Sequence, residues 1–189
     1  MFTIKRYVWL TTLLLGTVAA VSVIAPVQAG KSLDAQVIDN DVNVALEKLY
    51  KSSYAAKGLR ANAKGILVFP NIYKAAFIFG AQYGKGALMV NGTTTGYYNT
   101  LMASFGFQAG LQGFGYALFF MDDDSLSYLD RSDGWELGVG PSLVIVDVGF
   151  GKNFSSTTLK GQVYAFIFDQ KGAFGGISIE GAKITKINP

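Results

Sequence analysis

The side chains available for chemistry in this chain of 189 residues are carboxylates, amines and hydroxyls, because the sequence contains no histidine and no cysteine. A Ser-His-Asp triad, a cysteine nucleophile and a zinc site made of Cys and His are therefore excluded. Asp147, between two valines, and Glu136, after Trp135, remain as candidate catalytic acids. A pair of carboxylates can hydrolyse a glycosidic bond, but the sequence gives no sign that these two lie near each other. We therefore expect no catalytic residues, no cofactor and no enzymatic activity.

A run of three aspartates at residues 122–124 has the ligand type that hard cations prefer. The spacing and the glycine of an EF-hand loop do not follow it. Aspartate is also a favoured residue at the N-terminus of a helix, where its carboxylate accepts hydrogen bonds from free backbone N–H groups. We therefore predict that the run caps a short helix that extends to about Leu129, and we expect no metal site.

Basic residues interspersed with aromatic ones form the clearest binding pattern, between residues 48 and 85. Cations beside amphipathic aromatic side chains suit the headgroup region of an anionic membrane. An ordinary solvated surface is the alternative interpretation for any single lysine. The candidate lipid-binding residues are Lys48, Lys51, Lys57, Arg60, Lys64, Lys74, Lys85, Tyr73 and Phe77.

The first 29 residues have the features of a secretory signal peptide. Lys5 and Arg6 precede an uncharged apolar run over residues 8–24, and the small-residue pattern Val-Gln-Ala ends at Ala29. We expect cleavage between Ala29 and Gly30. The alternative is that the run is kept as a membrane anchor, since it approaches the ~20 residues needed to span a bilayer.

The charge of the mature chain is close to neutral. The full sequence has 16 basic and 13 acidic residues, and the leader holds two of the basic ones and none of the acidic ones, which leaves 14 against 13. This balance does not resemble a nucleic-acid-binding protein. Attraction to an anionic surface must therefore come from a local patch of cations.

Hydrophobic periodicity predicts helices first and strands afterwards. Apolar residues recur at helical spacing over residues 38–52, and a second short helix is expected over 53–59. Strand-like runs follow from residue 64, among them 66–69, which Pro70 should end, and an alternating run over 105–111. Asn91-Gly92 is a strong signal for a hairpin turn.

The pattern predicts an α+β fold: a mostly antiparallel, strongly curled sheet or small barrel, with one or two N-terminal helices and a short helix near 123–130. An outer-membrane barrel is a rival, disfavoured because several strands are apolar on both faces.

Ordered blocks of the sequence resemble the SYLF-domain family. They are Ala-Lys-Gly-Ile-Leu-Val-Phe-Pro at 63–70 and further blocks at 74–77, 80–86, 96–99, 108–112, 116–121, 134–136 and 181–188. The resemblance implies one lipid-binding domain over residues 30–189, with a helical part at 32–62 and a β-rich core at 63–189. Eukaryotic members of the family are associated with phosphoinositides and some with actin, and bacterial members are typically exported. The resemblance therefore implies a periplasmic protein peripheral to a membrane, and it supplies no catalytic residues.

Two functional hypotheses follow from these observations. The first is a module that binds anionic phospholipid headgroups at a membrane surface of the bacterial cell envelope. The second is a structural or interaction protein of the envelope, which would use exposed strand edges and apolar patches to hold a protein partner or a second copy of itself. A carboxylate-based hydrolase is a third and weaker hypothesis.

Overall fold

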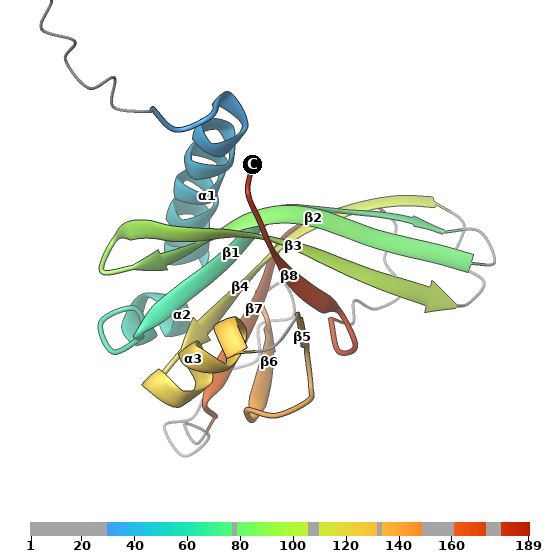
Figure 1. Cartoon of the computed structure of the whole chain (residues 1–189). Coiled ribbons are helices and arrows are strands. Elements are labelled where there is room, and N and C mark those ends of the chain that lie inside the picture. The colour runs from blue at the N-terminus through green and yellow to red at the C-terminus, as the bar shows by residue number, and fades with distance from the viewer. Residues whose placement is uncertain (1–29, 77–78, 106–109, 132–133, 149–160, 173–178) are drawn as a thin grey trace, which may run out of the picture. The chain divides into compact units, whose positions relative to one another are not determined.

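An eight-stranded sheet that curls strongly into a half-barrel forms the centre of the structure (Figure 1). The computed structural model describes residues 30–76, 79–105, 110–131, 134–148, 161–172 and 179–189. The strand order is β5-β8-β3-β2-β1-β4-β7-β6, and the described pairs are antiparallel except β6 with β7. The predicted α+β fold with a mostly antiparallel, curled sheet is confirmed. The strands are β1 (Gly65–Ala76), β2 (Phe79–Val90), β3 (Thr93–Phe105), β4 (Gly110–Phe120), β5 (Trp135–Glu136), β6 (Leu143–Asp147), β7 (Val163–Lys171) and β8 (Lys183–Ile187).

The helices of the described residues are α1 (Leu33–Ser52), α2 (Tyr54–Leu59) and α3 (Asp123–Arg131). Helix α1 begins five residues earlier than predicted, because Ser32 caps it: its Oγ accepts a hydrogen bond from the backbone N of Ala35 at 3.0 Å. The predicted cap of α3 is confirmed, since Asp122 Oδ1 accepts a hydrogen bond from the backbone N of Ser125 at 2.7 Å. Within the described ranges, no group of acidic side chains is arranged to hold a metal ion.

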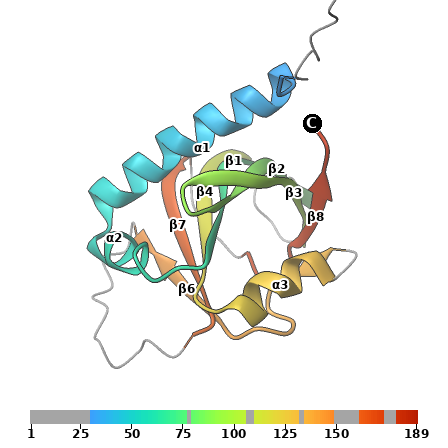
Figure 2. The same ribbon diagram turned by 60° about the vertical axis from the view of Figure 1, so that its left-hand side comes forward.

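The sheet has an apolar layer on each of its faces, and a different helix lies over each layer (Figure 2). On the inner face, the buried side chains of β1, β4 and β7 pack with Leu129 of α3 and Trp135 of β5. On the outer face, Val42 and Leu49 of α1 belong to one cluster with Phe119 of β4 and other strand residues. Strands that are apolar on both faces therefore lie between α1 and α3.

Two strand predictions require correction. Pro70 does not end its strand: β1 continues to Ala76, with a register shift against β4 between Phe69 and Ile72. Proline is tolerated at such an irregularity because no ladder hydrogen bond from its nitrogen is needed there. The alternating run 105–111 is not one strand, because Phe105 closes β3 and Gly110 opens β4. By contrast, the Asn91-Gly92 hairpin is confirmed, with φ of 51° and 78° at the two residues.

Asp39 connects α1 to β3, the strand that follows the Asn91-Gly92 turn, through side-chain hydrogen bonds. Its carboxylate accepts hydrogen bonds from Thr94 Oγ1 at 2.8 Å and from the Tyr97 hydroxyl at 3.2 Å, and it forms an ion pair with Lys31 Nζ at 2.6 Å. Burial raises the pKa of Asp39, but the hydrogen bonds from Lys31, Thr94 and Tyr97 together outweigh it, so the pKa lies below its usual value. The ionised form of Asp39 therefore stabilises the docking of α1.

We predict that Asp39→Asn lowers the free energy of unfolding by about 1–2 kcal/mol near neutral pH, because a charged acceptor is lost from partly buried hydrogen bonds. The pKa of Asp39 is lower in the folded chain than in the unfolded chain, where it is near 3.8. The stabilisation is therefore present above the unfolded-state pKa and is lost as the pH falls through the folded-state value. Urea unfolding over a pH series should show wild type and variant converging in acid. Asp41→Asn, on the same helix, is the control and should change stability by less than about 0.5 kcal/mol. A difference that persists unchanged in acid would contradict this role.

Candidate functional site

The outer face of the sheet is only partly covered by α1. Beyond the helix, Tyr73 of β1, Tyr83 of β2 and Leu101 of β3 stand directly opposite one another in register. They are 67, 42 and 55% exposed, respectively. Adjacent strands are about 4.8 Å apart, so the three side chains form a continuous row roughly 10 Å wide. We call Tyr73, Tyr83 and Leu101 the outer row. Large apolar side chains gathered in this way mark an interaction surface more often than scattered ones do.

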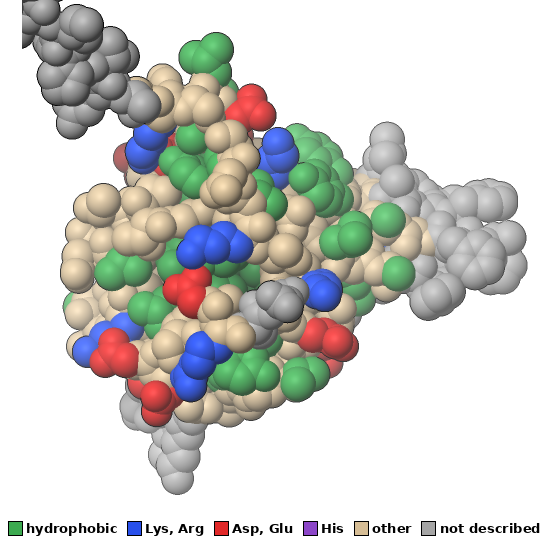
Figure 3. Space-filling model, in the orientation of Figure 1, with side chains coloured by type: hydrophobic (Ala, Val, Ile, Leu, Met, Phe, Trp, Pro, Cys, Tyr) green, Lys and Arg blue, Asp and Glu red, His purple; other side chains and the backbone are tan. Residues whose placement is uncertain are grey.

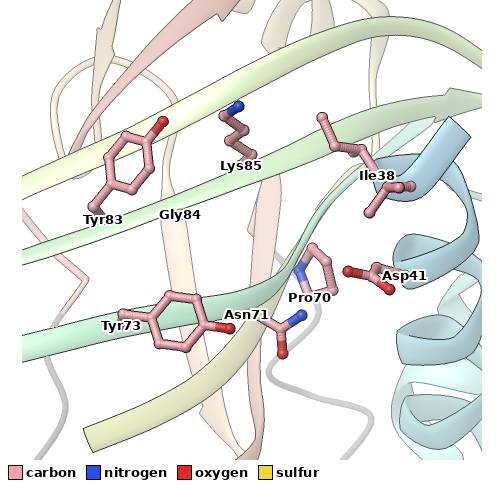
Figure 4. Close-up of a pocket in the computed structure, with 9 residues that line it drawn as sticks. Ile38, Asp41, Pro70, Asn71, Tyr73, Tyr83, Gly84 and Lys85 are labelled. Atoms are coloured by element: carbon pink, nitrogen blue, oxygen red, sulfur yellow. The ribbon is translucent and has the colours of Figure 1, made fainter. Parts of the chain in front are cut away.

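A groove of about 240 Å³ separates the outer row from α1. Figure 4 shows Tyr73 and Tyr83 side by side on neighbouring strands, with Ile38 and Asp41 of α1 facing them and Lys85 between the two groups. Val37, which is exposed on α1, also lines this groove. We call this groove the outer groove. It is lined by Val37, Ile38 and Asp41 of α1, by Pro70, Asn71 and Tyr73 of β1, and by Tyr83, Gly84 and Lys85 of β2.

The structure brings two of the predicted lipid-binding residues, Tyr73 and Lys85, together in the outer groove. Lys48 and Lys51 lie on the exposed face of α1 that also carries Leu33, Val37 and Val44, at helical spacing. Their basic charge therefore continues an exposed apolar stripe.

The remaining candidates are divided between other places. Lys57 lies on α2, Arg60 caps its C-terminus and Lys64 immediately precedes β1. Lys74 is only 6% exposed, and its register partners are Gln82 of β2 and Gln112 of β4. Gln82 and Gln112 are buried as well, so Lys74 is part of a polar cluster within the fold and not of the exposed surface. Phe77 lies outside the described residues, as does the proposed cleavage residue Ala29; Gly30 is described and exposed.

Three of the predicted cations face carboxylates. Lys48 pairs with Asp169 at 3.0 Å, Lys64 with Asp123 at 3.7 Å and Lys85 with Asp34 at 3.7 Å. The hydrogen bond from Lys48 is the main reason why the pKa of Asp169 lies below its usual value. On the face shown in Figure 3, basic and acidic side chains are interspersed and do not form a field of one sign. Exposed ion pairs contribute little, so these lysines can still exchange their partner for another anion.

The sequence did not identify Leu101 as a site residue, and it gave Tyr83 no role beyond one of several aromatic residues. Both become significant only through register, which places Tyr83 opposite Tyr73 and Leu101 opposite Tyr83. A run of exposed apolar residues on α1, with Val37 and Val44 between polar ones, was the local signal that could have pointed to this face.

The candidate catalytic carboxylates gain no support from their positions. Glu136 is exposed on β5, where it stands opposite Lys183 of β8. The side chain of Asp147, at the end of β6, lies outside the described side chains. In the part of the chain that the structure describes, no helix combines the length and the hydropathy required to cross a bilayer.

Comparison with known families identifies a match over part of the chain. The model of the family Ysc84, described as "Las17-binding protein actin regulator", matches residues 102–188. This is the SYLF-domain family that the sequence blocks resemble, so the predicted resemblance is confirmed. The match extends from the end of β3 through β8 and does not include α1, β1 or β2. No curated protein matches the chain. The outer groove is therefore identified from the geometry of this chain alone.

We predict that Gly84→Ala destabilises the protein by roughly 1–3 kcal/mol, because a Cβ there would lie 2.7 Å from the Asn71 carbonyl oxygen and against the Ile72 side chain. The methyl group would push β2 away from β1 beneath the outer groove. Gly58→Ala is the matched control, since a Cβ at that position of α2 meets nothing within 4 Å. It should leave stability unchanged or raise it by about 0.5–1 kcal/mol. Thermal unfolding of both variants checks this, and equal melting temperatures would refute the close approach.

Proposed function

We propose that this chain, of which residues 102–188 match the model of the SYLF (Ysc84) family, binds the surface of membranes in the bacterial cell envelope through its outer face. The observation that carries this proposal is the outer row, an uncovered line of Tyr73, Tyr83 and Leu101 beside the basic residue Lys85. The ligand would be the headgroup region of anionic phospholipids, with the protein exported and peripheral to the membrane.

The two tyrosines supply the main contribution to such binding. A tyrosine has an apolar ring and a polar hydroxyl, and it is favoured at the boundary between lipid and water. The rings of Tyr73 and Tyr83, with Leu101 next to them, would enter the boundary while the backbone of the sheet stays paired. Three hydrogen-bonded strands already hold the backbone of the outer row, so binding orders only its side chains.

Electrostatic attraction is the smaller contribution in this protein. A lysine near an anionic surface is worth ~1 kcal/mol, but α1 carries Asp34, Asp39, Asp41 and Glu47 against Lys48 and Lys51. Lys85 faces one of these acids, Asp34, at 3.7 Å, whereas Lys48 and Lys51 lie at the opposite, C-terminal end of α1. We therefore propose that Lys48 and Lys51 orient the protein on the membrane, while the outer row provides most of the affinity.

A protein partner is the alternative occupant of the same face. The name of the matched family describes binding to another protein, and an exposed apolar row also suits a protein interface. A concentration-dependent oligomer, or a stable complex with an envelope protein, in the absence of any affinity for vesicles would favour this alternative.

We predict that replacing Tyr73, Tyr83 and Leu101 together by serine weakens the binding of the protein to anionic vesicles by roughly tenfold or more, because most of the inserted apolar area is lost. Co-sedimentation with vesicles measures the partition coefficient, and far-UV circular dichroism checks the fold. Val139→Ser removes an exposed apolar side chain from the segment after β5 and should have no effect. Unchanged vesicle binding of the triple variant would remove the basis of the proposal.

We also predict that binding to anionic vesicles weakens with added salt and that Lys48→Glu combined with Lys51→Glu reduces it at low ionic strength. Each reversal replaces an attraction of ~1 kcal/mol by a repulsion, and salt screens both. Wild type and variant should therefore converge as salt is raised. Arg131→Glu combined with Lys186→Glu, at α3 and opposite it on β8, serves as the charge-matched control. Equal binding to neutral and anionic vesicles at all salt concentrations would show that the cations have no part in it.

A further inference from the structure

A second cavity lies along α1, on the other flank of the helix from the outer groove. Its volume is about 590 Å³, within the range of small-molecule sites. Asn43, Glu47 and Tyr50 line it from α1, whereas Val37 and Asp41 line the outer groove. At 100° per residue, these two sets are on opposite sides of the buried stripe of the helix. We call this second hollow the flank cavity.

An acidic and a basic side chain, Glu47 and Arg60, line the flank cavity and do not form an ion pair with each other. Glu47 and Arg60 are both exposed and both belong to its wall. Among the ion pairs of the described residues, neither takes part in one, with the other or with a third residue. Their charged groups are therefore more than 4 Å apart, which leaves space between them for a ligand that carries both signs of charge.

The ring of Tyr50 positions the side chain of Arg60 before any ligand binds. Its guanidinium lies over the ring of Tyr50, 5.1 Å from the centroid. Burial raises the pKa of Tyr50, while the charge of Arg60 lowers it to a smaller extent, so the ring stays neutral at physiological pH. A guanidinium stacked on an aromatic face keeps its N–H groups in one plane and directs them at a planar or tetrahedral oxyanion.

The rest of the cavity is amphipathic. Leu46 and Ile66 are buried and Met89 is half-buried at its floor, and Asn91 stands at its edge with an amide that can donate and accept. An apolar floor with a few polar groups of defined position is the usual composition of a site for a small amphipathic molecule.

We propose that the flank cavity binds a zwitterion in which a phosphate and an ammonium group are a few bonds apart, as in the headgroup of an ethanolamine phospholipid. Arg60 donates hydrogen bonds to the phosphate, Glu47 accepts them from the ammonium group, and Leu46 and Met89 contact the carbon chain next to the phosphate. The site shares no lining residue with the outer groove, so it stands or fails independently of the proposed function.

Titration calorimetry with three soluble probes tests the charge pattern. The purified protein should bind sn-glycero-3-phosphoethanolamine more tightly than sn-glycerol 3-phosphate or ethanolamine. Glu47→Gln should reduce the affinity for the zwitterion to that for glycerol phosphate, a loss of roughly threefold to tenfold for a partly exposed charged contact. Arg60→Gln should weaken both phosphate probes. Arg131→Gln, which removes a cation from α3 that does not line the cavity, should change none of the three affinities.

Vesicles distinguish the source of the ligand. Glu47-dependent binding to vesicles enriched in phosphatidylethanolamine identifies a headgroup in a bilayer, and binding of the soluble zwitterion alone identifies a free metabolite of the same chemistry. Equal affinity for glycerol phosphate and the zwitterion, or a Glu47→Gln variant that keeps the preference, overturns the proposal. Loss of binding to phosphatidylglycerol vesicles in the Glu47→Gln variant also overturns it, because Glu47 would then act on anionic lipid and not on the ammonium group. Serine substitution of the outer row should leave the affinities for the three soluble probes unchanged, because none of its residues lines the flank cavity, so failure of this site and failure of the proposed function are distinguishable.

Discussion

Burial of strands on both faces is the constraint on which the structure depends. The sequence Gly-Ile-Leu-Val-Phe of β1 and the apolar segments of β4 and β7 have no polar face that water could solvate. Curling the sheet covers one face, with Trp135 and α3 closing its interior. The other face needs a separate cover, which α1 provides. A helix is only about 10 Å wide, whereas strands of 12 or 13 residues are roughly 40 Å long. One helix therefore leaves part of the outer face bare, and the outer row lies there.

The position of α1 also explains why the two candidate sites occur where they do. A cylinder that crosses a curved sheet contacts it along one stripe and leaves a hollow on each side. The stripe contains Val42 and Leu49, and the hollows become the outer groove and the flank cavity. Their chemistry differs because residues half a turn apart on α1 differ: Val37 and Asp41 on one side, Asn43 and Glu47 on the other. One element thus determines the depth of both sites, and the strands beneath determine their floors.

Local signals in the sequence were sufficient for some elements and insufficient for others. Asn91-Gly92 and Asp122 act within three residues, so the hairpin and the cap could be predicted from the sequence. Pro70 was misleading, because the register shift that accommodates it depends on β4, some 45 residues later. The same dependence on partners accounts for Lys74. A lysine in a strand was expected at the surface, but after the shift it stands between Gln82 and Gln112, which share its burial. Leu101 became part of a site only through its pairing with Tyr83.

The pairing of β3 with β8 has a consequence for how the chain reaches this fold. Tyr97 and Ile187 are opposite each other although they are ninety positions apart in the sequence. The β2–β3 hairpin can close quickly through its two-residue turn. Pairing of β8 with β3 closes a much longer loop, and the conformational entropy of that loop is lost before the hydrogen bonds between the two strands can offset it. Until β8 pairs, the backbone groups of β3 between Tyr97 and Leu101 that face it are unpaired and lie next to the outer row. The kinetics of the last strand thus set the period during which this surface is open to pairing with another chain.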